Sequence, residues 1–163
     1  MTESTKKAWP WIYLSIFIIV CDQFTKYLVL KHFTEQTIVH IFPFLNFILS
    51  FNAGASFGFL DAQSGWQIYL LSAVSIIVSI ILITWLCRHA RSEWMIAMPV
   101  SLVLGGALGN LMDRLRFGFV TDFIDFHVNG WHFATFNIAD SAVSVGATWI
   151  VLRLLYESFT RES

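Results

Sequence analysis

The sequence predicts a mainly α-helical, polytopic membrane protein with four transmembrane helices and a small extracytoplasmic β-rich segment lying on the membrane. Of its 163 residues, 56% are hydrophobic and only 13% are charged, whereas soluble domains carry about 25% charged residues. Four apolar stretches are long enough to cross the hydrocarbon core, which takes about 20 helical residues. The net charge of −1 gives no indication of nucleic-acid binding.

The four predicted spans cover about residues 9–30, 66–87, 94–112 and 138–156. We expect residues 1–163 to form a single membrane-embedded domain. Several tryptophans lie near the predicted ends of these spans, as in the aromatic belts of membrane proteins. They are Trp9, Trp11, Trp66, Trp85 and Trp94.

Basic residues predict the orientation of these spans. Six of the ten lysines and arginines lie in the N-terminal segment, in the short link between the second and third spans, or near the C-terminus. Because cytoplasmic segments are enriched in lysine and arginine, both termini are predicted to be cytoplasmic. The six are Lys6, Lys7, Arg88, Arg91, Arg153 and Arg161.

Two segments, about residues 31–65 and 113–137, then belong to the outer side. The first is rich in Ile, Val and Phe, but Pro43, Asn46 and Asn52 interrupt it. We therefore expect short strands with an aromatic surface on the membrane, rather than a fifth span.

Five aspartates gather near this outer surface, although they belong to different parts of the chain. Charged groups in or near membrane spans are energetically unfavourable and indicate function by default. The five are Asp22 in the first span, Asp113 at the end of the third, Asp122 and Asp125 in the second outer segment, and Asp140 at the start of the fourth span.

Two of these aspartates are candidates for chemistry. Asp140 follows Asn137 by three residues, which is also the spacing of a helix cap, so a purely structural role is an even alternative. Asp122 lies among phenylalanines with no basic residue nearby in sequence, and apolar surroundings raise the pKa of a carboxyl group. Asp125, in the same stretch, is the main rival of Asp122.

The other two aspartates have structural explanations close by. Asp22 and Lys26 are spaced i,i+4 and can pair on one helix face. Asp113 is followed by Arg114, which favours an ion pair between these neighbours.

The glycines of GGALGN (Gly105–Asn110) indicate a close helix crossing rather than a ligand loop.

His127 and His132 are possible metal ligands, but a third ligand is not apparent in the sequence, so we expect neither a metal nor a cofactor. Two neighbouring carboxyl groups can share a proton, activate water and protonate a carbonyl oxygen. The same cluster could serve a small ion- or proton-coupled carrier, or only pair with basic residues in a structural subunit. Physical reasoning from the residues leaves these alternatives open.

Five motifs together resemble the bacterial prolipoprotein signal peptidase family, signal peptidase II. The resemblance covers nearly the whole chain and places each motif in order. The motifs are DQFTK (Asp22–Lys26), FNAGASFGF (Phe51–Phe59), GGALGNLMDR (Gly105–Arg114), VTDFIDFH (Val120–His127) and FNIADSA (Phe136–Ala142).

The resemblance implies an aspartic endopeptidase of the bacterial cytoplasmic (inner) membrane, with its active site at the outer face. Such enzymes cut prolipoproteins before a cysteine already modified with diacylglycerol. The family's catalytic pair corresponds to Asp122 and Asp140. The residues that match its supporting positions are Asn52, Gly54, Asn110, Asp113, Arg114, Asn137 and Ala139, with Asp22 and Lys26 as its first-span pair.

The resemblance also implies the partners. They are diacylglyceryl-modified prolipoproteins, membrane lipid and inhibitory cyclic peptides of the globomycin type, with no nucleic acid. We expect a monomer without a cofactor.

Overall fold

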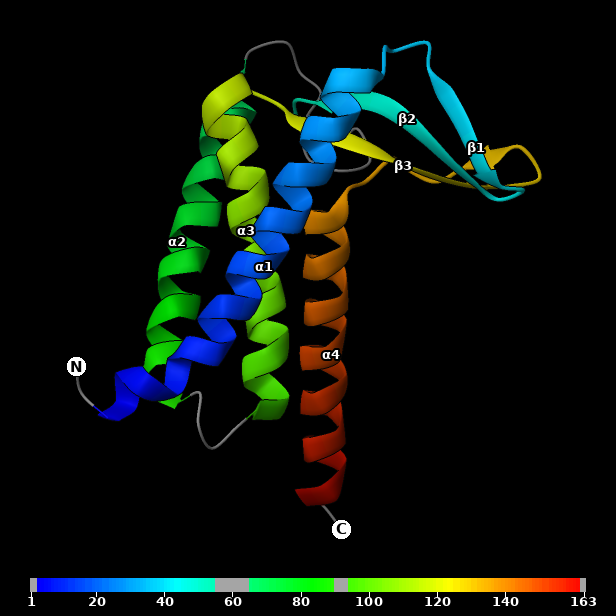
Figure 1. Cartoon of the computed structure of the whole chain (residues 1–163). Helices are drawn as coiled ribbons and strands as arrows, with labels where there is room; N and C mark the ends of the chain where they lie inside the picture. The colour runs from blue at the N-terminus through cyan, green and yellow to red at the C-terminus, as the bar shows by residue number, and fades with distance from the viewer. Residues whose placement is uncertain (1–2, 55–64, 90–93, 162–163) are drawn as a thin grey trace.

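Four long helices form a bundle with a small sheet at one end, as the computed structural model shows (Figure 1). The structure describes residues 3–54, 65–89 and 94–161. The helices are α1 (Glu3–His32), α2 (Trp66–His89), α3 (Trp94–Phe117) and α4 (Ile138–Arg161). All four are long and apolar enough to cross a membrane, which confirms the predicted fold class.

The bundle is built around α3, which packs against the other three helices. Of its most apolar stretch, 56% is buried, against 17–22% for the other helices. The remaining helices expose large apolar side chains on their outer faces, including Phe17, Ile80 and Leu152. Such an apolar exterior suits lipid rather than water.

Glycines allow α1 and α4 to approach α3 closely, as the GGALGN motif predicted. A Cβ on Gly105 would lie 2.8 Å from Ile18 Cβ of α1, and one on Gly106 would meet the backbone oxygen of Ala139 on α4. A Cβ on Gly109 would lie 2.8 Å from a carboxylate oxygen of Asp22. The expected close crossing is therefore confirmed, and it brings α1 and α4 together at the sheet end of α3.

The sheet consists of β1 (Ile38–Phe42), β2 (Leu45–Asn52), β3 (Val120–Val128) and β4 (Trp131–His132), paired antiparallel in that order. The first two confirm the strands expected between residues 31 and 65. The second outer segment also forms strands, because β3 pairs with β2 and places Asp122 opposite Ser50.

The third helix is longer than the sequence predicted. The third helix does not end near residue 112 but continues to Phe117, so Asp113 and Arg114 lie inside it. The part of the FNAGASFGF motif from residue 55 onward lies outside the described residues, as does Arg91 of the expected cytoplasmic link. Both described ends of the chain lie at the end of the bundle opposite the sheet (Figure 1).

Candidate active site

Four of the five aspartates meet where the sheet joins the bundle, each from a different element: Asp22 from α1, Asp113 from α3, Asp122 from β3 and Asp140 from α4. Asp22, Asp113 and Asp122 are at most 2% exposed. Asp140 is half-buried. The predicted gathering of acids at one end is thus observed.

Asn137 connects the two candidate catalytic carboxyls. Its side-chain Nδ2 donates to Asp122 Oδ1 at 2.7 Å. Its Oδ1 accepts the Asp140 N–H at 2.8 Å, and its own backbone N–H donates to Asp140 Oδ2 at 3.3 Å. The last two bonds are the reciprocal cap that the sequence predicted for the start of α4. Capping and the link to Asp122 therefore coexist in one residue.

Two further asparagines each donate to one carboxyl of the pair. Asn52 Nδ2 donates to Asp122 Oδ2 at 3.0 Å, and Asn110 Nδ2 donates to Asp140 Oδ1 at 2.7 Å. The oxygen of each amide is also engaged: Asn52 Oδ1 accepts the N–H of Gly54 at 3.1 Å, and Asn110 Oδ1 accepts from Lys26 Nζ at 2.9 Å. These second contacts fix which end of each amide faces the carboxyl.

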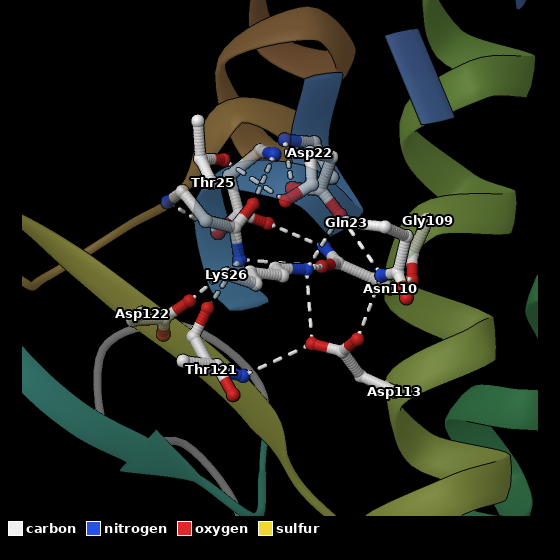
Figure 2. Close-up of polar contacts among 12 residues, drawn as sticks. Asp22, Gln23, Thr25, Lys26, Gly109, Asn110, Asp113, Thr121 and Asp122 are labelled. Carbon is white, nitrogen blue, oxygen red and sulfur yellow. Dashed lines mark hydrogen bonds and ion pairs between the residues drawn. The ribbon is translucent and has the colours of Figure 1, made fainter. Parts of the chain in front are cut away.

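Lys26 is the centre of the polar network between the helices (Figure 2). Its ammonium lies 2.8 Å from Asp22 Oδ2 and 3.0 Å from Asp113 Oδ2, besides its bond to Asn110. The i,i+4 pair predicted within α1 is confirmed. The expected pairing of Asp113 with its neighbour Arg114 was wrong, because Asp113 instead pairs with Lys26 across the helix interface.

Asp22 contacts the start of α4 in addition to its ion pair with Lys26. Its Oδ1 accepts the backbone N–H of Ala139 at 2.9 Å. That N–H belongs to the first turn of α4, where amide hydrogens lack helical partners. Asp22 therefore links α1 to the turn that carries Asp140.

Gln23 was not predicted as a site residue. Its Nε2 donates to Asp113 Oδ1 at 2.8 Å and to the Gly109 oxygen at 3.2 Å, and its Oε1 accepts from Arg116 at 3.2 Å. The only sequence signal is its place beside Asp22 in DQFTK. Its partners on α3 cannot be read from a spacing within α1.

Arg114 supplies positive charge near the pair. It interacts electrostatically with Asp140 most strongly, then with Asp122 and Asp113. Lys26 also acts electrostatically on Asp122 and Asp140, so two cations offset the negative charge of these carboxyl groups.

Asp125 belongs to a different site on the sheet. It lies three positions after Asp122 on β3, so the two side chains point to opposite faces. Its carboxylate accepts from Asn46 Nδ2 at 2.9 Å and lies 2.7 Å from His132 Nδ1. Burial acts to raise the pKa of Asp125, but these hydrogen bonds outweigh it and the pKa is lowered. The main rival is therefore separated from Asp140.

The pKa of Asp122 is raised to about 7. Burial is the largest cause, and the negative charge of Asp140 adds to it. Hydrogen bonds from Asn52 and Asn137 and the charge of Lys26 oppose the increase. A carboxyl group with this pKa is protonated in a substantial fraction of molecules at neutral pH, so it can donate a proton.

A cleft of about 450 Å³ opens beside Asp140. It is lined by the segment that leads from β4 into α4, including Phe133 and Phe136, and by Ser141 of the first turns of α4. Aromatic rings and the carboxyl group of Asp140 together make a mostly apolar cleft with an ionisable group in its wall, as is typical of ligand-binding sites.

Comparisons with known proteins point to one family. The family model described as signal peptidase (SPase) II matches residues 14–156. A lipoprotein signal peptidase of Coxiella burnetii (strain Dugway 5J108-111) is 52% identical over 155 residues, covering 95% of each chain. One from Burkholderia vietnamiensis (strain G4 / LMG 22486) is 42% identical over 142 residues, covering 87% of this chain and 85% of its own.

Solved structures show the same architecture. A bacterial membrane enzyme with 32% sequence identity superposes with a TM-score of 0.82, over 91% of this chain and 89% of its own. Sequence and fold thus agree over nearly the whole length, and the chain belongs to the signal peptidase II family.

Proposed function

We propose that Asp122 and Asp140 are the catalytic dyad of this chain. As a member of its family, the chain is a lipoprotein signal peptidase, a membrane aspartic peptidase that removes signal peptides from prolipoproteins. The observation that carries the dyad is the direct link of both carboxyls to Asn137, with Asp140 lining the cleft. Family membership also favours a peptidase over the ion- or proton-coupled carrier.

The surroundings of the two carboxyls support different roles. Asp140 lies in the first turn of α4, where the helix dipole favours an anion, and it accepts hydrogen bonds from Asn110 and Asn137. It is also half-buried and lines the cleft, so water can reach it. Asp122 is fully buried with a raised pKa. Asp140 is therefore the base and Asp122 the acid.

The reaction then needs no covalent intermediate. Asp140 removes a proton from a water molecule, which attacks the scissile carbonyl carbon while protonated Asp122 donates to the carbonyl oxygen. This forms a tetrahedral diol between the two carboxyls. When the C–N bond breaks, Asp140 returns the proton to the leaving nitrogen and the diol gives a hydroxyl proton back to Asp122. Arg114 and Lys26 balance the negative charge throughout.

The substrate and the membrane determine where this happens. In the predicted topology both termini are cytoplasmic, which puts the sheet and the dyad at the outer face of the inner membrane. Two acyl chains of a diacylglyceryl-modified cysteine keep the scissile bond at headgroup depth. The exposed apolar residues of β1, including Ile38 and Phe42, suit a sheet that rests on this surface. Cyclic peptides of the globomycin type would compete for the cleft, and a monomer contains every residue of the site.

A cleavage assay tests the dyad. Purified protein receives a diacylglyceryl-modified prolipoprotein and, in parallel, the same substrate without lipid. Asp122→Asn and Asp140→Asn should each lower turnover by roughly 10²- to 10⁴-fold, the usual contribution of general acid–base catalysis. Asp125→Asn is the matched control, because it removes the same charge from the same strand. Near-normal turnover of either dyad variant, or an equal loss in Asp125→Asn, would contradict the assignment.

A further inference from the structure

An apolar groove continues from the catalytic cleft along one side of α4. The cleft beside Asp140 includes Ser144 and Val145 in its wall. A second hollow of about 710 Å³ shares these two residues and continues over Thr148 to Arg153. Because the two hollows share residues, they form one continuous surface, which we call the α4 groove.

The residues of the α4 groove are typical of a surface that receives another helix. Ser144, Val145 and Thr148 are exposed, and their spacing of three to four places them along one helix face. Small side chains at this spacing let a second helix approach closely in a membrane. The hydroxyls of Ser144 and Thr148 have no hydrogen bond in the part of the chain that the structure describes, so a partner with polar backbone or side-chain groups would suit them better than an acyl chain.

The length of the groove also fits a particular occupant. Asp140 and Arg153 are separated by about 20 Å along the axis of α4, at about 1.5 Å per residue. At the far end, where Arg153 and Tyr156 line the hollow, Arg153 pairs with Glu157 at 2.6 Å. The apolar region of a signal peptide has about 7–15 residues and would span about 10–22 Å as a helix.

We propose that the α4 groove binds the apolar helix of the signal peptide. The strands of the sheet take no part in this binding. The inference rests on the peptidase function proposed above and extends it from the scissile bond to the part of the substrate that crosses the membrane. With the scissile bond at Asp140, the apolar helix descends along Thr148 and ends near Arg153. The lipid chains of the modified cysteine belong to the other side of the scissile bond and remain outside the groove.

Tryptophan substitutions test the groove. Thr148→Trp fills it and should lower kcat/KM by roughly tenfold or more, mainly through KM, as overpacking of an interface does. Ala147→Trp is the matched control, since Ala147 is exposed at the same depth but about 100° around the helix. Equal kcat/KM values for the two variants, with a wild type that cleaves normally, would overturn the groove while leaving the peptidase intact.

Crosslinking identifies the occupant. A photoreactive amino acid replaces Leu152, which also lines the groove, in an Asp122→Asn enzyme that holds uncleaved lipidated substrate. We expect mass spectrometry to find the crosslink in the apolar region of the signal peptide. Crosslinks only to the diacylglyceryl chains, or only to bulk membrane lipid, would overturn the proposal. A wild-type enzyme that fails to cleave the lipidated substrate would overturn the peptidase function, and the groove with it.

Discussion

Removing the amide of Asn52 should shift the alkaline limit of activity. Asn52 Nδ2 donates to Asp122 at 3.0 Å, and a donor stabilises the ionised carboxylate. A hydrogen bond to a charged group contributes about 1.5–3 kcal/mol, and one pKa unit corresponds to about 1.36 kcal/mol. Because Asn52 is half-buried, water can replace part of its contribution. Asn52→Ala should therefore raise the pKa of Asp122 from about 7 by about one unit.

The pH profile of kcat/KM measures this shift, since it reports the ionisation of the free enzyme. If protonated Asp122 is the acid, kcat/KM of the wild type falls as pH rises through about 7. For Asn52→Ala, the same fall in kcat/KM should occur about one pH unit higher. Asn46→Ala is the matched control, because it removes an amide that donates to Asp125 from the same strand. A descending limb that stays in place in Asn52→Ala, or moves equally in Asn46→Ala, would refute the reasoning.

Three other predictions concern stability. Lys26→Met leaves two buried carboxylates without their cation and should reduce the free energy of unfolding by roughly 3–5 kcal/mol. Arg153→Met, in the more accessible ion pair, should change it by less than about 1 kcal/mol. Thermal unfolding of the two variants in detergent measures the difference. Gly106→Ala places a methyl group against the Ala139 backbone and should reduce the free energy of unfolding by roughly 1–3 kcal/mol. The thermal midpoint of unfolding should fall accordingly, and an unchanged midpoint would contradict the close crossing. Because the pKa of Asp122 rises on folding from 3.8 to about 7, its protonated form stabilises the fold below pH 4 by about 4 kcal/mol relative to alkaline pH. That stability is lost progressively between about pH 4 and 7, so unfolding of wild type should depend more on pH in this range than unfolding of Asp122→Asn.

The spans and the depth of the acids could be predicted because both depend on local sequence. Apolar length determines a membrane helix, and helical rise gives each acid a depth along it. The cap at the start of α4 was readable for the same reason, since Asn137 and Asp140 are three residues apart. The end of α3 was misjudged, because the charge of Asp113 suggested the end of the span, whereas that charge is paired with Lys26 of another helix inside the bundle.

Contacts between distant segments could not be predicted from spacing. Lys26 meets Asp113 only after α1 and α3 have packed, and the sequence offered the adjacent Arg114 as a more obvious partner. Asp122 and Asp125 are separated because side chains alternate between the two faces of the strand they share. Predicting this separation would have required recognising β3 as a strand. Phenylalanine-rich sequence around these acids indicated only an apolar environment.

Asparagine amides are well suited to hold a pair of carboxyls that must exchange a proton. A lysine or arginine in direct contact would keep its carboxylate ionised and lower its pKa, which would prevent that group from acting as an acid. Asn52, Asn110 and Asn137 instead position Asp122 and Asp140 with neutral donors, while each amide is itself oriented by a second bond. The cation Lys26 contacts Asn110 rather than the dyad, so it fixes the geometry at Asp140 through a neutral group. Replacing Asn110 with a charged residue would therefore disturb the ionisation of the pair even if the helices kept their packing.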